Sequence, residues 1–202
     1  MVMPSRRQVL LLVLGCLVLG LGVSLLLAAD LGSDGYSTLV NGISLRTGLS
    51  FGIVNLMVGV VLVVLAAARK VRPGPGTVVQ VVLVGVTVSV VFGLLGTPDG
   101  LVTRILLIAA AFPVLAVGIA MYLGSHTGAG PAEAAALAYD PPVPSRWSYS
   151  AVQGGGAVVG WLLGATVGVG TLAVIFLLGP AVDLASRRLH LDVHQGAPAV
   201  RD

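Results

Sequence analysis

Long uncharged apolar runs constrain this chain more than any other feature of its sequence. The first covers residues 9–29, which are 21 residues without a charge, and a helix needs about 20 apolar residues to cross a bilayer about 30 Å thick. Hydrophobic residues make up 56% of the chain and charged residues only 9%, whereas soluble domains carry about 25% charged residues. Because so apolar a chain must place its surface against lipid, we expect an all-α membrane protein.

About six such runs follow one another along the chain. They cover residues 9–29, 51–68, 77–95, 105–123, 149–167 and 169–185. The last two almost touch, and a single uncharged helix over 151–182 would measure about 48 Å at 1.5 Å per residue, which is too long for one crossing. We therefore expect this stretch to bend at its glycines, which include Gly164, Gly168 and Gly170.

The basic residues predict how these spans are oriented. Six spans with a cytoplasmic N-terminus place only Arg46 and Arg104 outside the cell. The basic residues placed inside are Arg6, Arg7, Arg69, Lys70, Arg72, Arg146, Arg187, Arg188 and Arg201. Because cytoplasmic loops are enriched in Lys and Arg, we expect a multi-pass protein with both termini in the cytoplasm.

A polar stretch interrupts the apolar pattern directly after the first run. Residues 28–45 contain Asp30 and Asp34 near their start. They continue as a short amphipathic pattern that includes Tyr36 and Asn41. The spacing predicts a helix that is too short to span a bilayer, with residue 33 or 34 as its N-cap. We expect this first polar break either to fold back into the membrane or to lie at its surface.

A weaker copy of this break lies about a hundred residues further along, at residues 124–133. It contains His126 and also Pro131 and Glu133, two residue types that favour the first turn of a helix. A second short helix is therefore expected to begin at this break. His126 is the one histidine near a break, so it is also a candidate for proton coupling near neutral pH.

The two breaks belong to an internal repeat. Residues 18–37 align without gaps on the residues 96 positions later, which pairs Asp30 with His126 and Gly32 with Gly128. Three spans per half is an odd number, so the second half would enter the membrane upside down, as in the inverted repeats of many secondary transporters. The expected units are a cytoplasmic N-terminus (1–8), two three-span repeats (9–97 and 98–186) and a polar cytoplasmic tail (187–202).

Several stretches carry a family pattern. They are residues 29–36, residues 47–52, the Gly-Trp-Leu-Leu-Gly run at 160–164, the Gly-Val-Gly-Thr run at 168–171, and Gly179-Pro180. Together they resemble the bacterial YczE/YyaS/YitT-like family of integral membrane proteins over roughly residues 7–184. Gly35-Tyr36 departs from that pattern, which has a Pro followed by an aromatic residue, and Ala165 stands in place of a second Gly. The resemblance implies a multi-span protein of the bacterial inner (plasma) membrane, and it implies no substrate or reaction.

The polar residues of the two breaks and of the second spans are candidates for a solute site. If both breaks fold back into the membrane, two helix N-termini converge there, and their positive ends favour an anionic group. The candidate residues are Asp30, Asp34, Tyr36, Asn41, Asn55, His126, Glu133 and Gln153. In the alternative interpretation the carboxyls are solvated at the two membrane surfaces, and Asn55 and Gln153 make hydrogen bonds between helices.

The remaining features favour packing rather than catalysis. Gly156, Gly160, Gly164 and Gly168 recur every four residues, which permits close contact between helices or between protomers of a homo-oligomer. Cys16 is the one cysteine, so neither an internal disulfide nor a multi-cysteine metal site is expected. No catalytic pair or phosphate-binding loop stands out, and no metal spacing appears inside the spans. We expect no enzyme, no cofactor, no metal and no nucleic-acid partner.

Two functional hypotheses remain open at this stage. The first is a secondary transporter or binder of a small solute, with an anion as one option, and with proton coupling through Asp30, Asp34, His126 or Glu133. The second is a membrane partner or assembly factor that transports nothing, in which the glycine ladder and the basic cytoplasmic face dock another protein. In both, the bilayer is the immediate environment of the chain.

Overall fold

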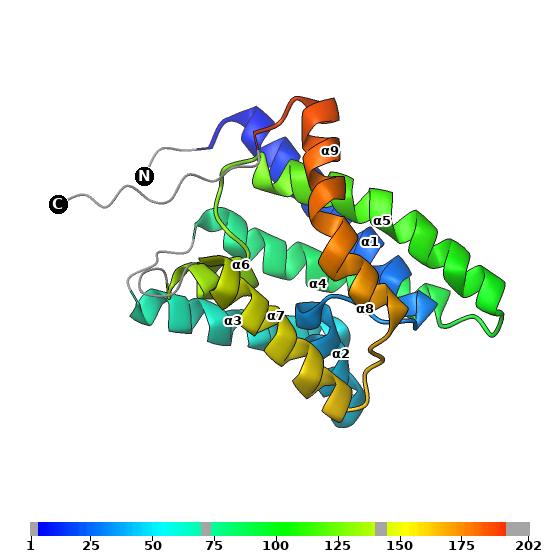
Figure 1. Cartoon of the computed structure of the whole chain (residues 1–202). Coiled ribbons are helices and arrows are strands. Elements are labelled where there is room, and N and C mark those ends of the chain that lie inside the picture. Colours follow the sequence, from blue (N-terminus) through cyan, green and yellow to red (C-terminus); the bar gives the residue numbers. More distant parts are fainter. Residues whose placement is uncertain (1–3, 70–73, 140–144, 193–202) are drawn as a thin grey trace.

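The computed structural model describes residues 4–69, 74–139 and 145–192, and every regular element within these ranges is helical (Figure 1). The elements are α1 (Arg6–Ala29), α2 (Gly35–Thr47), α3 (Phe51–Ala68), α4 (Pro75–Leu95), α5 (Leu101–Leu123), α6 (Pro131–Leu137), α7 (Ser145–Leu162), α8 (Val169–Ala173), the π-helix η1 (Val174–Leu178) and α9 (Gly179–Leu189). Lys70, Arg72, Arg201 and most of the expected polar tail lie outside the described residues.

Five helices in the described part are long and apolar enough to cross a membrane. They are α1, α3, α4, α5 and the continuous helix Val169–Leu189, which combines α8, η1 and α9. Their outer faces carry large exposed apolar side chains, such as Leu94 and Val102. This surface suits lipid, where it costs no exposure of apolar groups to water.

The sixth expected span, over residues 149–167, is only partly helical. The helix α7 ends at Leu162, and it carries Gln153 together with several Ser, Tyr and Gly residues, so it falls below the hydropathy of the other five. The sixth span was expected because this stretch carries no charge. Polar residues without a charge satisfy that criterion, although they are not apolar. By length and composition the described residues therefore hold five candidate spans, and α7 meets only the length criterion.

The chain bends between α7 and α8, as the length of the uncharged stretch predicted. Residues 163–168 are not helical, and Gly164 has φ +103°, a conformation that glycine adopts without a steric cost. This corrects the expected glycine ladder, because a side chain at Gly164 would have nothing within 4 Å. Gly156 and Gly160 do lie against α2, and Gly168 lies against Leu31.

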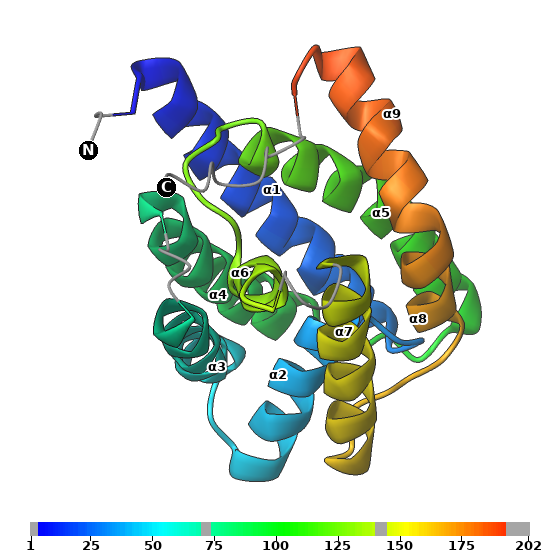
Figure 2. The ribbon, with the colours of Figure 1, turned by 60° about the vertical axis from the view of Figure 1, so that its left-hand side comes forward.

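The helix α1 lies in the middle of the fold and packs most extensively against α5 and α4 (Figure 2). Glycines make the α1–α5 contact close. A Cβ atom at Gly15 would lie 2.6 Å from the backbone nitrogen of Tyr122, and one at Gly118 would lie 2.5 Å from that of Leu19. Both distances are shorter than real contacts, so this helix pair depends on the absence of side chains at these positions.

The two polar breaks are anchored in matching ways. After α1, the backbone N–H of Gly170 donates to the carbonyl of Leu31 at 2.8 Å. After α5, the backbone N–H of Gly76 donates to the carbonyl of Thr127 at 3.1 Å. Each break is thus held by the start of the last long helix of the other half of the chain.

The residues paired by the internal alignment also share backbone conformations. Asp30 and His126 both lie in the left-handed region, with φ of 49° and 51°, and Gly32 and Gly128 have φ of 104° and 143°. The short helices behave alike too, since α2 packs on α7 and α6 packs on α3. Figure 2, in which α6 is seen along its axis, shows α6 surrounded by longer helices, whereas α2 lies at the edge of the bundle between α3 and α7.

Candidate functional site

A cavity of about 770 Å³ lies inside the helix bundle, between the first turns of α2 and α6. Its other walls come from α1, α3, α4, α5, α7 and the helix Val169–Leu189, and most of the lining side chains are apolar. The polar and ionisable lining residues are Asp34, Tyr36, Ser37, Asn55, Gln80, Tyr122, Glu133, Tyr149, Ser150, Gln153, Thr171 and Asp183. Small-molecule sites have this character, with volumes of about 300–1,000 Å³ and a few polar groups in apolar walls.

Five of the eight candidate residues line this one cavity. They are Asp34, Tyr36, Asn55, Glu133 and Gln153. They come from the two breaks and from the second long helix of each half, which are far apart in the sequence. Their convergence places both breaks within the bundle, as the re-entrant interpretation requires. That these residues bind a solute stays a prediction.

A set of hydrogen bonds joins four of the cavity walls. The backbone N–H of Tyr36 donates to Oε1 of Gln153 at 2.9 Å, and Nε2 of Gln153 donates to the Tyr149 hydroxyl at 2.8 Å. The Tyr36 hydroxyl donates to Oδ1 of Asn55 at 2.9 Å, and Nδ2 of Asn55 donates to the carbonyl of Val81 at 2.7 Å. Asn55 and Gln153 therefore orient the tyrosines and tie α2 to α3, α4 and α7.

Each short helix meets the cavity with a carboxyl group of its own. Asp34 is the N-cap of α2, and its Oδ2 accepts the backbone N–H of Ser37 at 2.9 Å. Glu133 lies in the first turn of α6, which Pro131 begins, and its carboxyl folds back beside Gly130. Both carboxyls thus lie at the positive ends of their helix dipoles, where negative charge is favoured.

These two carboxyls change the expectation about the solute. Asp34 and Glu133 lie outside the five candidate spans. Burial raises the pKa of Asp34 above its ordinary value of 3.8, and hydrogen bonds from Ser37 oppose this rise. Burial also raises the pKa of Glu133 above its ordinary value of 4.5, and the charge of Asp34 raises it further. Among the described residues that line the cavity, none is Lys, Arg or His. An anionic solute would meet carboxyls rather than free helix N-termini, so the geometry does not favour one.

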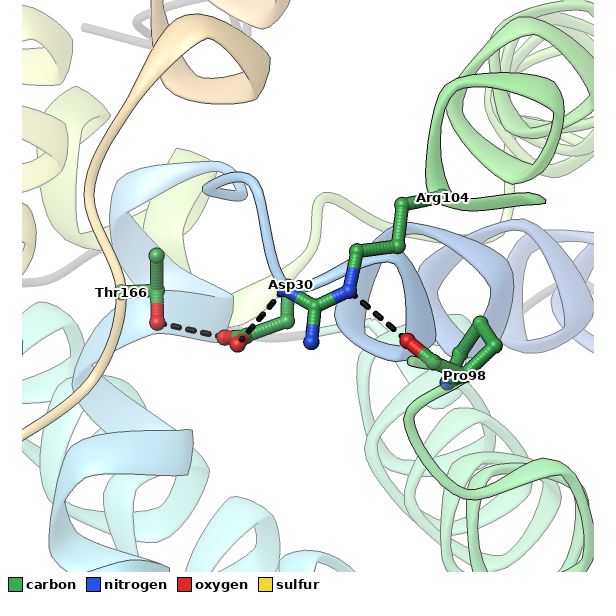
Figure 3. Close-up of polar contacts among 4 residues, drawn as sticks. All are labelled: Asp30, Pro98, Arg104 and Thr166. Atoms are coloured by element: carbon green, nitrogen blue, oxygen red, sulfur yellow. Dashed lines mark hydrogen bonds and ion pairs between the residues drawn. The ribbon is translucent and has the colours of Figure 1, made fainter. Parts of the chain in front are cut away.

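Asp30, a predicted site residue, faces a different set of partners (Figure 3). Its Oδ2 lies 3.5 Å from a guanidinium nitrogen of Arg104, and its Oδ1 accepts the hydroxyl of Thr166 at 2.5 Å. Nε of Arg104 also donates to the carbonyl of Pro98 at 2.8 Å. Asp30 therefore joins the end of α1 to the first turn of α5 and to the loop after α7, and it does not line the large cavity.

The other two candidates also lie away from the cavity. Asn41 borders a small hollow of about 10 Å³ beside Asp30 and Thr166, which has room for about one water molecule. His126 is exposed at the end of α5 and has the left-handed backbone described above. Neither residue is placed to contact a solute in the large cavity.

We predict that Asp30→Asn has only a small effect. The Asp30–Arg104 pair is partly exposed, with 42% and 26% of the two side chains accessible, and exposed ion pairs contribute at most about 1 kcal/mol. Asn can still accept the Thr166 hydroxyl. Thermal unfolding in nanodiscs should therefore show a fall in Tm of no more than about 2–4 °C. A much larger fall would show that this contact is needed to hold the first break in place.

Sequence reasoning missed several lining residues. Tyr122, Asp183 and Gln80 face the cavity from α5, α9 and α4, and Tyr149 faces it from α7. Tyr149 stands near the start of an apolar run, where aromatic residues usually mark a membrane interface. Only the packing of distant helices brings these residues together, so no local pattern identifies them.

Clusters of side chains that could bind a metal ion are absent from the described ranges. Within residues 4–69, 74–139 and 145–192, no group of three or more His, Cys, Asp or Glu side chains is arranged to hold one. The polar side chains of the cavity are instead distributed over separate walls.

Comparison with known proteins matches the chain to a family and to a bacterial relative. The family described as "Family of unknown function (DUF6198)" matches residues 6–187. An uncharacterized protein of Haemophilus influenzae is 25% identical over 171 residues, which are 82% of this chain and 77% of that protein. No solved structure matches the chain.

Proposed function

Since the chain belongs to the DUF6198 family, whose function is unknown, we propose from its cavity that it is a proton-coupled secondary transporter of a small solute. The solute occupies the cavity between the first turns of α2 and α6, and Asp34 and Glu133 carry the exchanged protons. The likeness to the YczE/YyaS/YitT-like family is compatible with this proposal, because that resemblance implies no other activity. The proposal includes no catalytic reaction and no cofactor.

One observation carries the proposal. Two polar breaks about a hundred residues apart supply carboxyls to the same apolar-walled cavity. Irregular backbone and ionisable groups within a membrane are costly unless they line a cavity or meet protein partners. Their presence on one cavity is therefore better explained by a path for a polar solute than by packing alone.

The matched contacts of the two halves support alternating access. Residues 9–97 and 98–186 are proposed to be inverted repeats, since their breaks share backbone conformations and are anchored by equivalent helix starts. In such transporters the binding site lies between the repeats, and one repeat rocks against the other. We place the protein in a bacterial cytoplasmic membrane and propose that α7 supplies a sixth crossing beside the five candidate spans. With six crossings both termini lie inside, in agreement with the distribution of the basic residues.

The alternative function is a membrane partner or assembly factor. It would use the close helix contacts at Gly156 and Gly160 only for packing, and its cavity would be filled by lipid or by another protein. The two hypotheses differ in one measurable respect, which is whether the cavity is reached by water. In a transporter, water reaches the cavity from at least one side of the membrane.

We predict that Ala157→Cys is labelled from water and that Val158→Cys is not. Ala157 lines the cavity, whereas Val158, its neighbour on α7, is 56% exposed on the outer face of the bundle and would lie against lipid. Cationic and anionic membrane-impermeant methanethiosulfonate reagents are applied to the protein in proteoliposomes, from each side. The wild type gives the background, because its one cysteine, Cys16, is fully buried.

Labelling of Ala157→Cys at least tenfold faster than labelling of Val158→Cys is the expected result. Protection of both cysteines from both sides would contradict the transport proposal and favour the partner hypothesis. Using reagents of both charges keeps the result independent of the charge of the solute. Each variant replaces a small or medium-sized apolar side chain of α7 by cysteine, so we expect the two variants to fold equally well.

A further inference from the structure

The charges that face the cavity all have the same sign. The lining residues of α1, α3, α4, α8 and η1 include no ionisable side chain. The ionisable groups on the other walls are Asp34 and Tyr36 at the start of α2, Tyr122 on α5, Glu133 on α6, Tyr149 on α7 and Asp183 on α9. A solute in the cavity therefore meets three carboxyls, and no described lining residue supplies a positive charge to pair with them.

Carboxyls in such surroundings need a compensating partner. An ionised carboxylate is costly in an apolar environment unless it is paired or protonated. Asp34 accepts the backbone N–H of Ser37, and Glu133 lies in the first turn of α6. The positive end of a helix compensates only part of a charge. A proton or a cationic solute completes the compensation, whereas an anion adds repulsion. Protons and a cation would thus compete for the same place.

The size and the walls of the cavity distinguish an organic cation from an inorganic one. Metal cations bind several oxygen ligands at about 2.0–2.6 Å. The described residues contain no cluster of three or more Asp, Glu, His or Cys side chains that could hold a metal ion. A cavity of about 770 Å³ with mainly apolar walls instead has room for a hydrocarbon body. Such a body would gain free energy from leaving water.

The tyrosines add a second preference for a cation. The hydroxyls of Tyr36 and Tyr149 are bonded to Asn55 and Gln153, which fixes both rings at the cavity wall. Aromatic rings attract ammonium groups, and cages of such rings recognise quaternary ammonium compounds. The carboxyls and aromatic rings that line this cavity therefore select for the same chemical class.

We propose that the cavity binds an organic monocation with an apolar body, such as an aromatic amine or a quaternary ammonium compound, and exchanges it for protons held at Asp34 and Glu133. This inference rests on the proposed transport function and specifies its substrate class. Binding of the cation displaces protons from the carboxyls to the water on that side. Release on the other side allows the carboxyls to take up protons again.

The test compares two probes of nearly equal shape and opposite charge. Tetraphenylphosphonium and tetraphenylborate are titrated against the full chain in nanodiscs, with empty nanodiscs subtracted, and benzyltrimethylammonium serves as a smaller cation. We expect both cations to bind, with an affinity at least tenfold higher at pH 8 than at pH 5.5. Asp34→Asn and Glu133→Gln should each weaken this binding at least tenfold, and Asp30→Asn, which lies outside the cavity, should not change it.

Three outcomes would overturn the inference: binding of tetraphenylborate as tight as that of the phosphonium, no binding of either cation, or cation binding that the Asp34→Asn/Glu133→Gln double variant retains. Thermal unfolding of each variant checks that it is folded. Cysteine labelling separates this inference from the proposed function. If Ala157→Cys is labelled from water and no cation binds, only the substrate class is wrong; if it is protected, the transport proposal fails as well.

Discussion

A Glu133→Gln variant is expected to be more heat-stable than the wild type at neutral and alkaline pH. Burial and the nearby charge of Asp34 raise the pKa of Glu133 above its ordinary value of 4.5. Gln has almost the same shape and can still accept a hydrogen bond at the start of α6, but it never becomes charged. The variant therefore removes the cost of an ionised group in the cavity and keeps the packing.

The direction of the pH effect follows from proton binding. Below pH 4.5 both the folded and the unfolded chain hold the proton, so the full stability is present. As the pH rises, the unfolded chain releases the proton first, and the folded state of the wild type loses stability until the pH passes the raised pKa. For each pH unit in that interval the loss is about 1.4 kcal/mol, or a fall in Tm of about 3–5 °C for a chain of this size.

The measurement is Tm in nanodiscs between pH 4 and pH 9, without added solute. The wild type should become less stable as the pH rises, and Glu133→Gln should flatten part of that fall. Asp99→Asn is the control, because Asp99 is an exposed carboxyl in the loop before α5 and should leave the profile unchanged. Parallel profiles for the wild type and Glu133→Gln would show that Glu133 is not in an apolar environment.

The same two carboxyls illustrate which parts of the site could be predicted from the sequence. The N-cap was predicted at Ser33 or Asp34 and is Asp34, and Pro131 was predicted correctly at the first position of α6, because helix starts depend on a few neighbouring residues. The gathering of Asp34, Glu133, Asn55 and Gln153 was a hypothesis that required both breaks to turn inward. Local pattern could not decide this, since interfacial and re-entrant breaks share the same residues.

The differences between the sequence reasoning and the structure have equally specific causes. Asp30 was assigned to the solute site as a carboxyl of the first break, and His126 as the one histidine near a break. Their matching feature is instead a left-handed backbone at the end of a long helix, and Asp30 pairs with Arg104, which is 74 residues away. The span over 149–167 was counted by absence of charge, a criterion that does not register the polar side chains by which α7 borders the cavity.

The contact between α2 and α7 leads to the second large effect, a loss of stability in Gly160→Ala. A Cβ atom at Gly160 would lie against the carbonyl oxygen of Thr38 and 2.8 Å from the nitrogen of Leu39. The facing glycine of α2, Gly42, is equally close, since a Cβ there would lie 2.5 Å from the Gly160 carbonyl oxygen. Because these neighbours are backbone atoms, one helix must move to admit a methyl group.

Overpacking of this kind costs about 1–3 kcal/mol, which predicts a fall in Tm of about 3–10 °C in nanodiscs. Gly155→Ala is the matched control on the same helix, because a Cβ at Gly155 would have nothing within 4 Å. Its greater helix propensity should leave Tm unchanged or slightly higher. Equal Tm values for the two variants would contradict the close crossing of α2 and α7.

If α7 is displaced, Gln153 moves away from the backbone N–H of Tyr36. Gly160→Ala should therefore also weaken cation binding, although Gly160 does not line the cavity.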